Sequence, residues 1–354
     1  MQWDLYCRVI DNHGDIGVGW RLAADLARRG ESVRLAVDDA SALAWMAPAG
    51  VERVTVVGWN DGPSAAPDVV VELFGAGRPP GSWRIGSAAP LLVNVDHLTA
   101  EPYAERAHGL PSPLRRAGEP PSTTWFYFPG FTRESGGLLR EPGLLDRRRE
   151  FGRGDAWLAS LGIAPIDGER RVSLFCYRND ALGELLDALS TTPTLLLATA
   201  GAATEQVTSL LGPSLRRGRL RVRPLPLLSQ DDFDRLLWSS DLNLVRGEDS
   251  LVRAIWAGAP FLWQLYVQDD GAHNAKLAAF LDLYFAGADP VLESAARAAF
   301  ERWNGKGDAR SVEQIASSGS LEQAWTAHAL ARRDTVAGQP DLVSRLIAFV
   351  EAKR

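Results

Sequence analysis

Residues 246–250 read Arg-Gly-Glu-Asp-Ser, an order of residue types suited to gripping an anion. The apolar run 242–245 before them predicts a buried strand, and the amphipathic run 251–257 after them predicts a helix. A helix N-terminus offers N–H groups and a partial positive charge. The guanidinium of Arg246 adds a fork that can hold two phosphate oxygens. The segment therefore predicts a phosphate-binding turn.

A second polar turn, residues 11–17, follows a strand-like run at residues 3–10 and carries two carboxylates, Asp11 and Asp15. Ligands of open α/β sheets gather at the carboxyl ends of strands, which makes Asp11 a candidate base. Asp15 has a simpler alternative as the N-cap of a helix that begins at residue 16. From the residues alone, Asp11 is therefore the preferred base.

The glycines of this turn, Gly14, Gly17 and Gly19, permit a tightly turned backbone. They do not match G-x-G-x-x-G, which argues against a dinucleotide site. His13 beside them is typical of a solvent-facing turn residue.

A third set of residues falls at the expected carboxyl edge of the second half's strands. It comprises Phe175, Tyr177, Gln230, Phe233, Arg246, Glu248, Asp249, Ser250 and Tyr266. Aromatic rings can sandwich a nucleobase, and a glutamine can pair with both a donor and an acceptor on its edge. Five of them have a structural alternative: Phe175 and Phe233 as core, Gln230 as part of a helix cap, and Glu248 and Asp249 as partners of the helix dipole. Their coincidence at one edge favours a binding site.

Two runs of alternating elements must position these residues. The first half predicts strands at residues 3–10, 32–37, 51–59, 69–74, 91–96 and 123–131, helices at 16–29 and 40–46, and a proline-rich surface loop at 111–121. The second predicts strands at 172–176, 194–198, 220–224, 242–245 and 260–265, and helices at 181–189, 203–211, 230–238, 251–257 and 270–283, before a last helix at 340–352. Such alternation is typical of parallel, doubly wound α/β sheets, with the junction at 147–169.

Bulk composition limits the class of protein. A length of 354 residues suggests two domains, and 46% hydrophobic with 23% charged residues is ordinary for a globular chain with ample core. A net charge of −6 gives no electrostatic case for nucleic acid. The chain shows neither a basic leader nor an apolar run of the roughly 20 residues that span a bilayer, so neither secretion nor membrane insertion is predicted.

The potential metal and thiol ligands have structural interpretations. Cys7 and Cys176 sit in strand-like runs, which predicts small buried residues and fits a reducing cytoplasm. The acidic pairs 38–39 and 231–232 lack histidine or cysteine partners at ligand spacing, so we expect no metal site.

Together these motifs resemble the bacterial EarP family of protein-arginine rhamnosyltransferases. The resemblance is carried, in matching order along nearly the whole chain, by residues 11–18, 108–113, 128–131, 136–140, 173–177, 229–234, 246–258 and 260–266. It implies a GT-B glycosyltransferase fold, with two facing Rossmann-like domains and a cleft between them. Residues 1–160 would form the acceptor-protein side, with helix 340–354 packing back on it, and residues 168–335 would bind the nucleotide sugar.

The resemblance also implies the reaction. The family transfers L-rhamnose from TDP-β-L-rhamnose, with inversion, to an arginine of translation elongation factor P, which activates that factor. It makes Asp15 the general base or the group that positions the acceptor, which reverses the preference for Asp11 above, and it makes Glu248 essential. Diphosphate contacts fall on Arg246, Asp249, Ser250 and Tyr266, and thymine and deoxyribose contacts on Phe175, Tyr177, Gln230 and Phe233. Departures from the family pattern at His13, Asp96 and His97 bear on how the acceptor protein docks.

Other functions remain open from the residues. One alternative is a GT-B transferase with another nucleotide sugar or a small-molecule acceptor, and another is a non-catalytic module that binds elongation factor P. The joint presence of Asp11, Asp15 and Glu248 favours an enzyme. We expect a cytoplasmic monomer without cofactor or metal, whose partners are the donor and elongation factor P and neither nucleic acid nor membrane.

Overall fold

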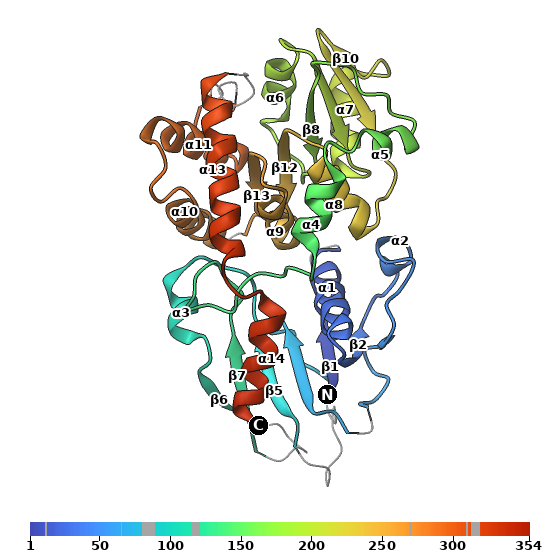
Figure 1. Ribbon diagram of the computed structural model, residues 1–354, viewed down its shortest axis with the longest axis vertical. Helices are drawn as coiled ribbons and strands as arrows, with labels where there is room; N and C mark the ends of the chain where they lie inside the picture. Colours follow the sequence, from blue (N-terminus) through green and yellow to red (C-terminus); the bar gives the residue numbers. More distant parts are fainter. Residues whose placement is uncertain are drawn as a thin grey trace. The chain divides into compact units, whose positions relative to one another are not determined.

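The computed structural model describes residues 1–10, 13–64, 66–79, 89–114, 121–268, 271–308, 311–312 and 319–354 (Figure 1). The chain forms two compact units, the first made of Met1–Pro142 with Val336–Arg354 and the second of Gly143–Thr335. In the described part, no helix is both long and apolar enough to cross a membrane.

The first unit is built on a seven-stranded sheet. In chain order its strands are β1 (Gln2–Cys7), β2 (Ser32–Val37), β3 (Val54–Gly58), β4 (Val69–Leu73), β5 (Leu91–Val95), β6 (Pro111–Leu114) and β7 (Ser122–Tyr127). The order across the sheet is β3-β2-β1-β4-β5-β7-β6, and the pairs are parallel apart from β6 with β7. Strand order therefore reverses direction between β1 and β4, which makes the carboxyl ends of these two strands the switch point of the sheet.

Strand β6 corrects the prediction of a surface loop over residues 111–121. Pro111 and Pro113 lie in this antiparallel edge strand, opposite Trp125 and Thr123 of β7. Proline has no N–H to donate, but an edge strand needs hydrogen bonds on only one side, so it tolerates proline. A proline-rich composition is therefore no obstacle to a strand in this position.

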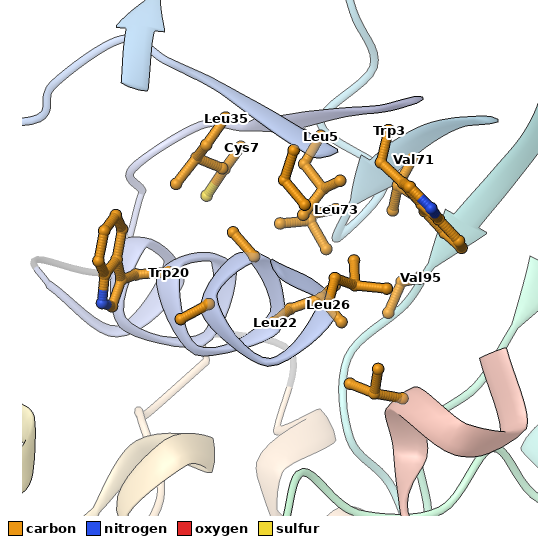
Figure 2. Close-up of a cluster of buried hydrophobic side chains, with 14 of the residues drawn as sticks. Trp3, Leu5, Cys7, Trp20, Leu22, Leu26, Leu35, Val71, Leu73 and Val95 are labelled. Carbon is orange, nitrogen blue, oxygen red and sulfur yellow. The ribbon is translucent and has the colours of Figure 1, made fainter. Parts of the chain in front are cut away.

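In the described part of this unit, the helices are α1 (Gly14–Arg28), α2 (Leu43–Met46), α3 (Pro102–Ala107) and α14 (Leu342–Lys353). Helix α1 packs closely on the sheet, because a Cβ added to Gly19 would lie 3.2 Å from Leu73 Cδ1 and 3.4 Å from Cys7 Sγ. The apolar side chains between α1 and the strands form one buried cluster (Figure 2). Helix α14 adds Leu346 and Val350 to that cluster, and Arg29 ties it to α1 through Asp341 at 2.8 Å.

The second unit holds a six-stranded sheet. Its strands are β8 (Arg170–Leu174), β9 (Thr194–Ala198), β10 (Arg216–Arg217), β11 (Leu220–Pro224), β12 (Leu242–Arg246) and β13 (Phe261–Gln264). They lie in the order β10-β11-β9-β8-β12-β13, parallel except for the β10–β11 hairpin. The switch point of this sheet is at β8 and β12.

The second unit's helices, among the residues that the structure describes, are α4 (Leu144–Phe151), α5 (Asp155–Ser160), α6 (Leu182–Leu189), α7 (Ala202–Leu211), α8 (Gln230–Trp238), α9 (Gly247–Ala257), α10 (Ala272–Tyr284), α11 (Pro290–Trp303) and α13 (Ser320–Ala337). The first unit ends at Pro142, earlier than the predicted residue 160, because α4 and α5 pack on α8. The Phe151 ring lies 5.5 Å from that of Trp238, and Trp157 Nε1 donates to Asp232 at 3.0 Å.

Candidate functional site

The switch point of the second sheet brings two predicted segments together. The N–H of Phe175, just after β8, donates to the carbonyl of Leu244 in β12 at 2.8 Å. The loop that follows β8 therefore lies beside the turn that follows β12. Ligands of open α/β sheets bind at this kind of position.

Arg246 is the centre of an aromatic cluster at this edge. Its guanidinium carbon lies 4.6 Å from the Phe175 ring centroid and 4.2 Å from that of Tyr177, within the range of cation–π attraction. Phe233 meets Phe175 edge-on at 5.3 Å, and Tyr266 meets Tyr177 edge-on at 5.7 Å. The structure thus gathers these five predicted site residues in one place.

Helix α9 begins at Gly247, not at residue 251 as predicted, so Glu248, Asp249 and Ser250 form its first turn. Gly247 has a φ of 69°, in the left-handed region that glycine adopts without strain. Its carbonyl accepts the Trp263 indole N–H at 2.8 Å, which anchors the turn on β13. The N-terminus of a helix carries a partial positive charge and directs N–H groups outward, so a turn of this kind is suited to binding an anion.

Ser250 makes a local hydrogen bond in this turn. Its side chain is buried and its hydroxyl donates to the carbonyl of Arg246. The hydroxyl proton is therefore used within the helix, and the serine holds the carbonyl of the residue that carries the guanidinium. This bond supports the shape of the turn, whereas a direct hydroxyl contact to a phosphate would require the bond to be exchanged.

Glu248 forms an ion pair that the sequence analysis missed. Its Oε1 lies 2.5 Å from Nζ of Lys276 in α10, and both side chains are about four-fifths buried, with exposures of 19% and 21%. Residue spacing could not reveal a pair 28 positions apart. The one signal in the sequence is the rarity of lysine: among 38 lysine and arginine residues, the lysines are Lys276, Lys306 and Lys353.

Gln230 is the first residue of α8 and lies half-buried at the same sheet edge. The alternative in which it caps the helix together with Asp231 is wrong, because the N-cap is Ser229. The Ser229 hydroxyl oxygen accepts the Asp232 N–H at 3.1 Å, and the hydroxyl donates to the Asp232 carboxylate at 2.8 Å. Gln230 is not needed for the cap.

Two glutamine side chains, one buried and one half-buried, hold the aromatic loop in place. Gln264 of β13 accepts the Tyr177 N–H at 2.9 Å and donates to the Arg178 carbonyl at 3.0 Å. Gln206 of α7 donates to the Tyr177 carbonyl at 3.1 Å. Buried polar groups of this kind are stable only when paired, so they specify one loop conformation. The sequence analysis did not single out either glutamine.

A buried ion pair fixes α9 against α8. Arg253 Nε donates to Asp234 Oδ1 at 2.8 Å, and both residues are almost fully buried. Nearby, Cys176 is a free, buried thiol, as predicted. Burial raises its pKa to about 12, and the nearby Arg246 charge only partly opposes this shift. The thiol is therefore protonated at neutral pH and has a packing role.

At the switch point of the first sheet, Asp15 lies in the first turn of α1 and is buried. The N-cap of α1 is His13, so the N-cap alternative for Asp15 is wrong. Its Oδ2 instead accepts the N–H of Ile10 at 2.8 Å, which ties the helix start to the chain after β1. Together with burial, the Asp15 charge keeps the pKa of the Cys7 thiol raised. Asp11 lies outside the described residues.

The neighbouring turn residues differ from expectation. Gly14, Gly17 and Gly19 lie within α1 and not in a tight turn, and close packing on the sheet accounts for Gly19. His13 is exposed, as predicted, and meets the Trp45 ring edge-on at 5.5 Å.

An aromatic stack at the ends of β4 and β5 was not predicted. The rings of Phe74 and His97 lie 4.6 Å apart and nearly parallel, at 18°. Phe74 has a φ of 59°, a strained value for a side chain of this size. Asp96 precedes this histidine and accepts its N–H at 2.7 Å. Among the described residues, no cluster of three or more histidine, cysteine or acidic side chains could hold a metal.

Comparison with known proteins gives the family. Residues 3–351 match the model of the elongation factor P rhamnosyltransferase family EarP. The protein-arginine rhamnosyltransferase of Pseudomonas aeruginosa is 41% identical over 374 residues, which cover 98% of each chain. That of Neisseria meningitidis serogroup B is 32% identical over 98% of this chain and 96% of its own length.

Solved structures agree with this assignment. A structure that explains EarP-mediated arginine glycosylation of translation elongation factor EF-P is 33% identical, with a TM-score of 0.70 over 100% of this chain and 99% of that chain. The spinosyn rhamnosyltransferase SpnG, at 16% identity and a TM-score of 0.57, shares the fold over 98% of this chain and 99% of that chain. The two Rossmann-like parallel sheets are those of a GT-B glycosyltransferase. The chain therefore belongs to the EarP family of elongation factor P rhamnosyltransferases.

Proposed function

We propose that this chain transfers L-rhamnose from TDP-β-L-rhamnose to an arginine side chain of elongation factor P, with inversion at the anomeric carbon. Family membership supports the reaction. The observation that carries the donor assignment is the Arg246 guanidinium, which lies over Phe175 and Tyr177 at the N-terminus of α9. The cation and the helix N-terminus suit the diphosphate of a nucleotide sugar, and the aromatic faces suit its base.

The second unit supplies the electrostatic part of the mechanism. As the glycosidic bond breaks, negative charge grows on the leaving TDP. Arg246 and the first turn of α9 stabilise that charge, and Asp249 and Ser250 belong to the same turn. Phe175, Tyr177, Gln230 and Phe233 hold thymine and deoxyribose, and Tyr266 reaches the diphosphate. No cofactor takes part, and we expect no metal requirement because protein groups supply the positive charge.

The first unit supplies the base. A guanidinium has a pKa above about 12 and is a poor nucleophile while protonated. Asp15 orients the acceptor cation and takes its proton as the C–N bond forms, and Asp11 assists it. A base needs to act only in the transition state, so the arginine need not lose its proton beforehand. Inversion follows from a single displacement.

Two other functions make distinct predictions. A GT-B transferase with another donor would be stabilised more by UDP than by TDP. A non-catalytic binding module would bind elongation factor P without transferring sugar. Glu248 with its buried ion pair favours the enzyme, since a silent module needs no carboxylate beside a phosphate grip. We expect a monomer in the cytoplasm, where two free thiols would persist.

Intact-mass analysis of elongation factor P tests the proposal. The factor is incubated with this protein and TDP-β-L-rhamnose in the presence of a chelator. A gain of one deoxyhexose, mapped to an arginine by peptide sequencing, is the expected result. No gain, while TDP still raises the melting temperature, would refute the acceptor and leave the donor assignment standing. A gain that requires added metal would refute metal independence alone.

A further inference from the structure

Lys276 has no role in the mechanism above, yet it contacts Glu248, which the family resemblance makes essential. Its ammonium lies 2.5 Å from the Glu248 carboxylate, and the pair is about four-fifths buried. Lys276 lies in α10, and Glu248 in the first turn of α9 next to the proposed diphosphate grip. The contact therefore joins a second helix to the edge of the donor site.

Glu248 poses an electrostatic difficulty at this position. A carboxylate in the first turn of α9 is favoured by the helix dipole, but it stands where the diphosphate must also bind. Like charges in a partly desolvated site repel strongly, because little water is present to screen them. An adjacent cation removes most of that repulsion while the carboxylate stays ionised. Lys276 is such a cation.

The type of cation fits the task. Other buried pairs of this unit use guanidinium groups, as in Arg253 with Asp234. A guanidinium is planar and tends to engage both carboxylate oxygens. An ammonium is a compact point charge, and that of Lys276 contacts one carboxylate oxygen, Oε1 of Glu248. One-point attachment therefore suits a carboxylate that must also serve a substrate.

We propose that Lys276 is a positioning residue of the donor site: its ion pair holds the Glu248 carboxylate and offsets its charge so that the nucleotide diphosphate can bind beside it. The inference rests on the proposed function, because it takes the turn at α9 as the diphosphate site. The alternative is a tie between α9 and α10 that serves folding alone. The two alternatives differ in what happens when Glu248 is also neutralised.

A double-mutant cycle, read out by calorimetric titration with TDP, separates them. The variants are Lys276→Met, Glu248→Gln and the double variant, with Lys306→Met as the control because that lysine is exposed. Lys276→Met should weaken TDP binding at least about tenfold, since it leaves a partly buried carboxylate facing the diphosphate. The double variant should bind TDP within about threefold of Glu248→Gln, and the control should match wild type.

Two results would overturn the inference. A double variant as weak as Lys276→Met would mean that the ammonium contacts TDP directly instead of acting through Glu248. Wild-type TDP affinity in Lys276→Met, with only a lower melting temperature, would mean a folding role. If wild type binds UDP in preference to TDP, the proposed donor fails, but the same four proteins titrated with UDP still test Lys276.

Turnover gives a second readout. At saturating donor, Lys276→Met should lower kcat for rhamnosylation of elongation factor P, because the Glu248 carboxylate is no longer held. Lys276→Arg keeps a cation in place and should recover most of the TDP affinity but less of kcat, because a fork engages both carboxylate oxygens. Equal recovery of both would count against one-point attachment.

Discussion

Replacement of Arg246 tests the proposed donor site most directly. The guanidinium lies over two rings, at 4.6 Å from Phe175 and 4.2 Å from Tyr177. Each such cation–π contact is worth about 0.5–1 kcal/mol, so about 1–2 kcal/mol is lost if the donor base takes the ring faces. Two charge-assisted bonds to phosphate contribute about 1.5–3 kcal/mol each. The net contribution of Arg246 to TDP binding is then about 3 kcal/mol.

Calorimetric titration measures this quantity. Arg246→Gln should weaken TDP binding by roughly two orders of magnitude, since every 1.4 kcal/mol is a factor of ten. Arg246→Lys keeps the charge but loses the fork and the stacking, and it should lose about tenfold. Thymidine lacks the diphosphate, so its affinity should be unchanged or slightly higher in both variants, because the ring faces are vacated.

The TDP and thymidine affinities of each variant, taken together, show whether Arg246 contacts the diphosphate. An equal loss of thymidine and TDP affinity in Arg246→Gln would show that the arginine only shapes the aromatic loop. A loss of TDP affinity below about threefold would remove it from the diphosphate site. A variant that is strongly destabilised could lose affinity for both ligands through unfolding. The titrations are therefore made on variants that melt within a few degrees of wild type.

Three further predictions concern the first unit. The Asp15→Asn variant should bind TDP normally but lower kcat by about 10²–10⁴-fold, the range for loss of a general base. Asp68→Asn is the control, because Asp68, like Asp15, accepts a backbone N–H at 2.8 Å, and this variant should keep wild-type kcat. Turnover near wild type in Asp15→Asn would refute its role. Gly136→Ala should destabilise the unit by about 1–3 kcal/mol in denaturant titration, because the added Cβ would lie 2.4 Å from the Tyr127 ring; no change would mean that the ring can move aside. Burial, and secondarily a nearby arginine, lowers the pKa of His108, so the folded state binds its proton less readily than the unfolded state. Its contribution to stability is then present above about pH 6.5 and lost as pH falls, and a melting series should show a smaller acid loss in His108→Gln than in wild type.

Local features of the chain could be predicted because they depend on neighbouring residues. Strands β2, β9 and β11 and helix α8 lie within the predicted bounds, since each is a periodic apolar run between turn residues. The phosphate-type turn at Arg246 was visible for the same reason: strand, glycine and helix start follow one another along the chain. Buried cysteines followed from apolar surroundings.

Tertiary structure decided what depends on distant partners. The prolines of residues 111–121 indicated a loop. The structure places Pro111 and Pro113 in an edge strand, which tolerates residues without an N–H because it needs hydrogen bonds on one side only. Helix α9 starts at Gly247 because its carbonyl is held by Trp263, 16 residues later. The pairing of Glu248 with Lys276 has no signature in spacing.

The same holds for the site as a whole. The sequence of strands along the chain predicts a doubly wound sheet, but only pairing of β8 with both β9 and β12 decides where the strand order reverses. That reversal sets Phe175 and Tyr177 beside Arg246, some 70 residues further along the chain. The amino-acid sequence determined which chemical groups this protein possesses and the local elements that carry them. The strand order and the packing determined which groups meet, because contacts between distant segments depend on the whole fold and not on any one run of residues.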